Sequence, residues 1–150
     1  PLDVAKVTND PCSGLTAAQL APYMGTLQRS TKSQYNNGTG CLFEPADGHQ
    51  AGIGVLVCPS NSGPGTLTQS GFPWQEPAGD IAGYPAEHQS QGGASGPATG
   101  DCQTMVAVSN QASLAVYIDD SEPDYKYYTD ACTAADKLAA ELIANIKGGG

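Results

Sequence analysis

The stretch "DACTAADKLAAELIANIK", residues 130–147, decides the fold, because it is the clearest helix in the chain. At 100° per residue, one group of apolar side chains falls within about 140° of arc, and Lys137, Glu141 and Ala144 lie opposite. An apolar stripe of this width needs a sheet or another helix to cover it. The stripe consists of Cys132, Ala135, Leu138, Ala139, Leu142, Ile143 and Ile146.

Several strands precede this helix and can supply the sheet. "CQTMVAVS" (102–109) and "SLAVYID" (113–119) alternate around the short turn "NQA" and predict a hairpin. "CLFEP" (41–45) and "GIGVLVC" (52–58) are joined by a turn-rich segment and predict a second antiparallel pair. "IAGYPAEH" (81–88) can start a further strand. We therefore expect about five strands.

The remaining segments predict a short helix and long loops. "TAAQLAPYMG" (16–25) begins with a capping box at Thr16. Residues 26–40 are polar and predict a loop or the approach to a hairpin, and residues 59–80 and 89–101 are rich in glycine, proline or serine. The predicted fold class is α+β, with an antiparallel sheet, a short N-terminal helix and the long C-terminal helix packed on one face.

The length of 150 residues fits one domain with its own core. We expect residues 1–9 to be the remnant of an N-terminal tether, residues 10–147 to form the domain, and residues 148–150 to be a flexible tail.

The charge excludes some partners. Fifteen acidic and six basic side chains give a net charge of −9, which repels nucleic acid and anionic membrane surfaces. The sequence contains no apolar run of about 18 residues, so we expect no transmembrane helix. Its first residues do not resemble a signal peptide, so a signal peptide, had there been one, would have been removed.

The five cysteines are Cys12, Cys41, Cys58, Cys102 and Cys132. They lack the paired C-x-x-C spacing of a structural zinc site, so they indicate disulfides and an oxidising compartment. The odd count leaves one thiol over. Any of the five cysteines could be that thiol, and the other four can pair in three ways. The count alone therefore does not determine the disulfide connectivity.

Cys12 could be a lipid attachment point, a reactive or metal-binding thiol, or half of a disulfide. Asn9, Asp10 and Pro11 precede it in place of the short apolar signal of a lipidated cysteine. A reactive thiol needs a basic neighbour, and only Asp10 lies nearby in sequence. We therefore predict a disulfide. Its expected partner is Cys132, because both cysteines lie near helix starts and both helices must pack on one core.

Short motifs recur along the chain in a fixed order. They are "PCSGLT" (11–16), Cys41 with Phe43, "IAGYPA" (81–86), Cys102 with Val106 and Val108, "SLAV" (113–116), and Cys132 with Ala135, Leu138 and Ala139. In this order and spacing the chain resembles an uncharacterised actinobacterial family of secreted lipoproteins, a domain of unknown function of the DUF3558 type. The resemblance spans about residues 10–147.

The resemblance implies two disulfides, Cys12 with Cys132 and Cys41 with Cys102, and leaves Cys58 as a reduced thiol. It also implies a protein anchored by lipid at the outer face of the membrane or secreted, with residues 1–9 as part of a linker. It carries no established activity and therefore no catalytic residue. Cys58 departs from the family pattern, as does Phe43, where tryptophan is commoner.

Two histidines are candidate metal ligands. His49 and His88 lie in segments without clear periodicity, and Cys58, Asp47 or Glu87 could complete a site. Isolated surface histidines are commoner than metal ligands, so we expect no metal and no cofactor.

An acidic segment has the opening spacing of a calcium loop. Asp120, Glu122 and Asp124 alternate as the first three ligands would, but Tyr125 stands where that loop needs glycine and Ala131 where it needs glutamate. The segment therefore predicts a solvated acidic turn.

Aromatic side chains are the candidate partner-binding residues. Phe72 and Trp74 lie on the 59–80 loop, and the prolines at 73 and 77 predict that Trp74 is solvent-exposed. A possible groove would be lined by Tyr117, Tyr125, Tyr127 and Tyr128, although such tyrosines usually seal the edge of a core.

Three functional hypotheses follow. The first is a non-enzymatic monomeric module of the cell envelope that binds an envelope or protein partner through its long loops. The second is a carrier with a pocket for a lipid or other small apolar ligand between sheet and helix. The third is a hydrolase or thiol enzyme that uses Cys58 with His49 or His88.

Overall fold

The structure is a computed structural model, and it describes residues 2–35, 38–59, 73–91 and 99–148. The helices are α1 (Ala5–Asn9), the 3-10 helix η1 (Pro11–Ser13), α2 (Ala17–Met24) and α3 (Ala131–Lys147). The strands are β1 (Leu27–Tyr35), β2 (Gly38–Pro45), β3 (Gly52–Cys58), β4 (Trp74–Ile81), β5 (Tyr84–Ser90), β6 (Asp101–Ala107) and β7 (Ser113–Asp119).

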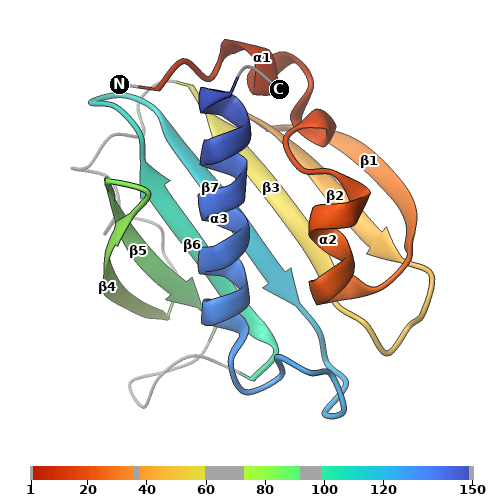
Figure 1. Cartoon of the computed structure of the whole chain (residues 1–150). Coiled ribbons are helices and arrows are strands. Elements are labelled where there is room, and N and C mark those ends of the chain that lie inside the picture. Colours follow the sequence, from red (N-terminus) through yellow and green to blue (C-terminus); the bar gives the residue numbers. More distant parts are fainter. Residues whose placement is uncertain (1, 36–37, 60–72, 92–98, 149–150) are drawn as a thin grey trace.

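The seven strands form one antiparallel sheet in the order β1-β2-β3-β7-β6-β5-β4. Figure 1 shows α2 and α3 in front of this sheet, with α3 crossing the strands β6 and β7. The α+β class, the antiparallel sheet and the helix on one face are confirmed. The expected number of strands was wrong, because the sheet has seven rather than about five.

The strand β1 lies in the segment that we expected to be a loop. It is an edge strand and pairs only with β2, and seven of its nine residues are exposed. A strand that is solvent-exposed on both faces does not alternate apolar and polar residues. The sequence "LQRSTKSQY" therefore did not predict a strand.

Strands β4 and β5 form a hairpin where the sequence predicted a single strand start. The two residues of the turn are Ala82 and Gly83, and both have positive φ, 51° and 87°. Positive φ at both central residues is typical of the type I′ turn, which connects the strands of two-residue hairpins. Alanine is an unusual residue in such a turn. Without an Asn-Gly or Asp-Gly signal, the turn was not recognisable.

The core lies between the sheet and α3. Leu138, Leu142 and Ile143 of α3 are at most 1% exposed, and they face Leu114 and Ile118 of β7, which are 2% and 0% exposed. Each such side chain contributes about 1.5–3 kcal/mol relative to exposure. These side chains fill the space between sheet and helix in which the carrier hypothesis placed its ligand.

Residues near the N-terminus pack on the domain. Val4 and Val7 are buried, the backbone N–H of Leu2 donates to the carbonyl of Val108 at 3.0 Å, and the hydroxyl of Thr39 donates to the carbonyl of Thr8 at 2.7 Å. The domain therefore includes α1, and the boundary expected at residue 10 moves toward the N-terminus.

The disulfide pairing that we expected is wrong. Cys12 is bonded to Cys41, and Cys102 is bonded to Cys132. The reason is the position of η1 along α3: the amide of Asn145 donates to the carbonyl of Gly14 at 2.8 Å, so η1 lies beside the last turns of α3. Cys132 is in the first turn, about 20 Å away along the helix axis.

Candidate functional site

The sheet has one face that no described helix covers, and we call it the open face. Side chains alternate along each strand, so the two faces can be assigned from the contacts of α1, η1 and α3. Cys41 and Phe43 of β2 point toward the helices, and Leu42 between them points away. In the same way, Val116 of β7 joins the core and Tyr117 lies on the open face.

An apolar patch lies on the open face at β1 and β2. Tyr35 and Leu42 are the exposed large hydrophobic side chains of the described chain, at 52% and 42%. The Tyr35 ring lies over Gly40, because a Cβ on that glycine would stand 2.8 Å from Tyr35 Cε2. Leu56 of β3 pairs with Gly40 and lies next to it, half-buried. Tyr35, Leu42 and Leu56 with Gly40 form what we call the open-face patch.

The patch continues across the sheet toward a polar region. Leu42 pairs with Gly54, Gly54 with Tyr117, and Tyr117 with Gln103, so these residues form one row across four strands. Gln103 donates its side-chain amide to Gln89 Oε1 at 2.8 Å. The row therefore changes from apolar at β2 to hydrogen-bonded and polar at β5.

Buried carboxylates flank this polar region. Burial raises the pKa of Glu87, although a hydrogen bond from Gln89 opposes the shift. Burial also raises the pKa of Tyr117, and the charges of Asp101 and Asp119 add to that effect. Asp101 and Asp119 pair directly in the register of β6 and β7, which places two carboxylates side by side.

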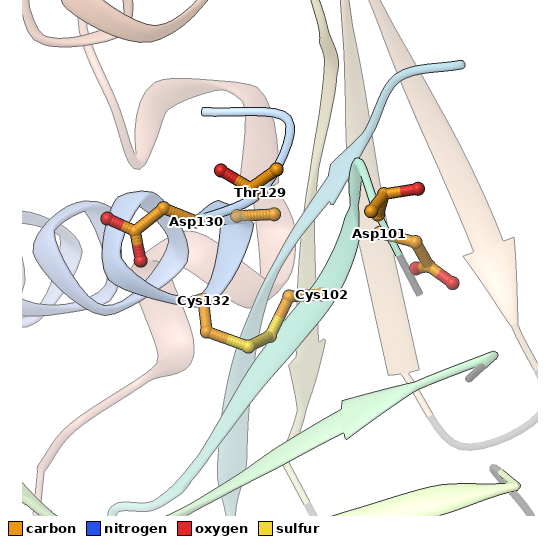
Figure 2. A pocket seen from close by; sticks show the side chains of 7 residues that line it. Asp101, Cys102, Thr129, Asp130 and Cys132 are labelled. Carbon is orange, nitrogen blue, oxygen red and sulfur yellow. A yellow bond between two sulfur atoms is a disulfide. The ribbon is translucent and has the colours of Figure 1, made fainter. Parts of the chain in front are cut away.

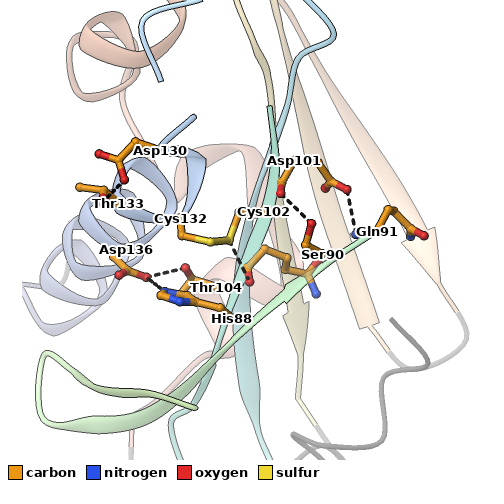
Figure 3. The surroundings of a disulfide bond; sticks show 11 residues. His88, Ser90, Gln91, Asp101, Cys102, Thr104, Asp130, Cys132, Thr133 and Asp136 are labelled. Carbon is orange, nitrogen blue, oxygen red and sulfur yellow. Dashed lines mark hydrogen bonds and ion pairs between the residues drawn. A yellow bond between two sulfur atoms is a disulfide. The ribbon is translucent and has the colours of Figure 1, made fainter. Parts of the chain in front are cut away.

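Three buried oxygens on the open face have no hydrogen-bond partner among the described residues. They are Glu87 Oε1, Asp101 Oδ1 and Ser113 Oγ. The other carboxylate oxygen of Asp101 accepts the backbone N–H of Gln91 at 2.9 Å, and Figure 3 shows this bond on the side away from α3. All three oxygens are buried, so they are not part of the exposed surface of the open face.

The predicted aromatic residues do not gather in one groove. Trp74 begins β4, is half-buried and stacks on the ring of His88 at 6.4 Å and 19°, so the prediction of an exposed loop residue was wrong. Proline at 77 did not prevent pairing, because β4 is an edge strand with an irregular register next to that residue. Phe72 lies outside the described residues.

The four tyrosines predicted to line a groove also lie in different parts of the fold. Tyr125 is 4% exposed and donates its hydroxyl to the carbonyl of Tyr23 at 2.7 Å, so it belongs to the core. Tyr127 and Tyr128 are half-buried and pack against the same core. Only Tyr117 of the four lies on the open face. The sequence did not distinguish them, because all lie near the end of a strand or in the connection that follows it.

Cys58 is outside both disulfides and its side chain is buried. It ends β3 on the open-face side, pairing with Ser113, whereas His88 lies on the helix-facing side of β5. His49 precedes the other end of β3, about 20 Å from Cys58. The structure therefore does not bring either histidine to Cys58, as the thiol-enzyme hypothesis required.

His88 contacts Asp136 of α3 near the disulfide of Cys102 and Cys132. Its Nε2 lies 2.7 Å from Asp136 Oδ1, and the hydroxyl of Thr104 donates to the same oxygen at 2.6 Å. Figure 3 shows this group on the helix-facing side of the sheet, next to the disulfide of Cys102 and Cys132. Because Thr104 donates to the carboxylate and not to the imidazole, the arrangement is not that of a nucleophile with its base.

His49 lies beside two carboxylates of the acidic turn. Its Nδ1 is 3.4 Å from Asp124 Oδ2 and 3.6 Å from Glu122 Oε2. The charge of Asp124 and a hydrogen bond with it raise the pKa of His49, and Glu122 and Asp47 add to this effect. Of the metal-ligand sets considered from sequence, none joined His49 to Glu122 or Asp124, because the two segments are far apart in the chain.

A small pocket lies at the start of α3 (Figure 2), with a volume of about 160 Å³. It is lined by Thr99, Asp101, Cys102, Thr129, Asp130, Ala131 and Cys132. A helix N-terminus favours anions, but the carboxylate of Asp130 lies at the same place and repels them. The pocket is also smaller than the roughly 300–1,000 Å³ of ordinary ligand sites.

The fold and the site define a disulfide-braced α+β domain with one open sheet face. The chain belongs to the DUF3558 family of proteins of unknown function, whose model matches residues 1–145. No curated protein matches the chain, and no solved structure does. No described helix is long and apolar enough to cross a membrane, and the disulfides are consistent with an extracytoplasmic location.

Proposed function

We propose that this chain is a non-enzymatic binding domain of the cell envelope that recognises a protein partner through the open-face patch. The observation that carries the proposal is the position of Tyr35 and Leu42. The two large apolar side chains that the described chain exposes lie together on the sheet face that no described helix covers.

Exposed apolar side chains at the centre of a contact are typical of protein interfaces. Gly54 has no side chain, so the surface between Leu42 and Tyr117 is low, and a partner side chain can approach the backbone there. The net charge of −9 argues against nucleic acid or an anionic membrane as the occupant.

The extracytoplasmic part of the proposal is supported by the two disulfides and by the resemblance to secreted actinobacterial lipoproteins. In that setting the protein is held at the outer face of the membrane by a lipid anchor or is secreted. The partner would then be another protein of the envelope.

The two other hypotheses receive less support. A carrier needs room in the interior, and the side chains of α3 and β7 fill it. A thiol enzyme needs a base at Cys58, and both histidines lie elsewhere.

The test compares two matched variants. Leu42→Glu places a charge in the patch, and Ala144→Glu places the same charge on an exposed position of α3. Each variant and the unchanged chain are immobilised and incubated with extracytoplasmic proteins of the producing cell, and the retained proteins are quantified by mass spectrometry.

We expect one or more proteins to be retained by the unchanged chain and by Ala144→Glu, and to be lost with Leu42→Glu. Circular dichroism of both variants should match that of the unchanged chain, because both positions are exposed. Equal retention by Leu42→Glu and the unchanged chain would contradict the proposal.

A further inference from the structure

Three potential metal ligands meet at one end of the sheet, away from the open-face patch. His49 comes from the connection between β2 and β3, and Glu122 and Asp124 come from the connection between β7 and α3. One ligand atom from each residue, His49 Nδ1 and a carboxylate oxygen from each acid, lies within 4.8 Å of the others. More than seventy residues separate the histidine from the acids in sequence.

The distances fit a shared ion. In tetrahedral coordination with bonds of about 2.1 Å, neighbouring ligand atoms are about 3.4 Å apart. His49 Nδ1 lies 3.4 Å from Asp124 Oδ2 and 3.6 Å from Glu122 Oε2. An ion could bind between these atoms with only small side-chain movements.

Both ligand segments are held by local hydrogen bonds. The backbone N–H of His49 donates to Asp47 Oδ1 at 2.9 Å, and the backbone N–H of Glu122 donates to Asp120 Oδ1 at 2.7 Å. The carbonyl of Glu122 also accepts the N–H of Tyr125, whose side chain is buried in the core. The backbone positions of the ligands are thus fixed on the folded domain.

A second, independent observation is the carboxylate of Asp120. This side chain is 8% exposed, and its Oδ2 has no hydrogen-bond partner among the described residues. Its other oxygen is bonded to the backbone of Glu122, so the carboxylate faces the turn that carries two of the ligands. A buried acceptor without a partner indicates a missing donor or cation.

The acidic side chains near His49 also favour a bound cation. Three carboxylates, those of Asp47, Glu122 and Asp124, act on the single imidazole of His49, which can balance at most one of their charges. The basic side chain in the same segment, Lys126, is placed over the ring of Tyr127 at 5.3 Å. A divalent cation would balance the charge better than the imidazolium ion does.

We propose that His49, Glu122 and Asp124 bind one divalent transition-metal ion, and that the ion joins the β2–β3 connection to the β7–α3 connection. One imidazole and two carboxylates suit Zn²⁺, whereas Ca²⁺ and Mg²⁺ prefer oxygen ligands alone. The remaining coordination position is left to water or to a group of a binding partner. This proposal differs from our sequence-based expectation of no metal, and it is independent of the function proposed above.

The test is isothermal titration calorimetry of the chelator-treated full chain with ZnCl₂, and separately with CaCl₂. We expect one Zn²⁺ per chain and no comparable heat with Ca²⁺. His49→Ala and Asp124→Asn should each weaken Zn²⁺ binding by at least about tenfold. Asp80→Asn, which removes an exposed carboxylate from β4, is the matched control and should bind as the unchanged chain does.

A second readout does not depend on heat. Zn²⁺ should shift the ring nitrogen resonances of one of the two histidines, and that signal should be absent in His49→Ala. The ligand residues are at least 43% exposed, so all variants should fold, as circular dichroism can verify. Absence of saturable Zn²⁺ binding, unchanged affinity in His49→Ala, or tighter binding of Ca²⁺ than of Zn²⁺ would overturn the proposal.

Discussion

Cys102 of β6 and Cys132 in the first turn of α3 are joined by a disulfide with a Cα–Cα distance of 5.1 Å, and this bond fastens the long helix to the sheet. Cys12 and Cys41 do the same for the N-terminal segment, because they join η1 to β2 at a Cα–Cα distance of 5.0 Å. Each half of the helical layer therefore has its own covalent link to the strand beneath it.

Removal of either disulfide should lower the free energy of unfolding by a similar amount. The sequence separations are 30 and 29 residues, for which loop-closure entropy gives at most about 3.6 kcal/mol each. The double variants Cys102→Ala/Cys132→Ala and Cys12→Ala/Cys41→Ala can be compared by urea denaturation. Cys58→Ala, which removes a buried thiol but no disulfide, is the control and should cost about 1 kcal/mol.

The pairing itself can be read from a non-reducing peptide map. Peptides that contain Cys12 should be linked to those with Cys41, and peptides with Cys102 to those with Cys132. A peptide that links Cys12 to Cys132 would show that the structural account of the helical layer is wrong.

The contact of Asp136 with β5 and β6 should contribute measurably to stability. Asp136→Ala removes the acceptor of the Thr104 hydroxyl, which is fully buried, and of His88. A buried donor without a partner costs about 1–3 kcal/mol, so we expect a loss of that size in urea denaturation. Asp136→Asn keeps an oxygen acceptor and should lose less.

Lys137→Ala is the control for this variant, because Lys137 is the next residue of α3 and is exposed. Its effect should be within about 0.5 kcal/mol. Equal losses for Asp136→Ala and Lys137→Ala would show that the hydrogen bonds of Asp136 do not stabilise the fold.

The elements with a strong apolar period were predictable from the sequence. The stripe of α3 and the alternation of β3, β6 and β7 gave their positions closely, because these elements bury one or both faces. The edge strands β1 and β4 were missed or shortened. Most of β1 is exposed on both faces, and β4 is half exposed and contains a proline and an irregular register, so neither has a regular apolar alternation. Sequence reasoning thus described the centre of the sheet better than its margins.

Relationships between distant segments were not predictable. The helix-start positions of Cys12 and Cys132 suggested a bond, but which end of α3 meets η1 depends on tertiary packing between Gly14 and Asn145. The same is true of His49, whose neighbours Glu122 and Asp124 become visible only once the two connections are placed at one end of the sheet. Local patterns contain no information on such contacts.

The buried carboxyl of Glu87 should make stability depend on pH in a direction opposite to that of a salt-bridged acid. Burial raises its pKa above the ordinary value of 4.5, so the folded chain holds this proton more tightly than the unfolded chain does. The contribution of Glu87 to the free energy of unfolding therefore falls as pH rises from about 4.5 through the raised pKa, and it stays lower at neutral pH.

Glu87→Gln removes this titration. Relative to the unchanged chain, the variant should be on the order of 1 kcal/mol more stable at pH 7 than at pH 4. Urea denaturation at several pH values between 4 and 8 measures the difference, with Glu76→Gln, at an exposed position of β4, as the control. Parallel pH profiles for Glu87→Gln and the unchanged chain would mean that the burial of Glu87 does not perturb its ionisation.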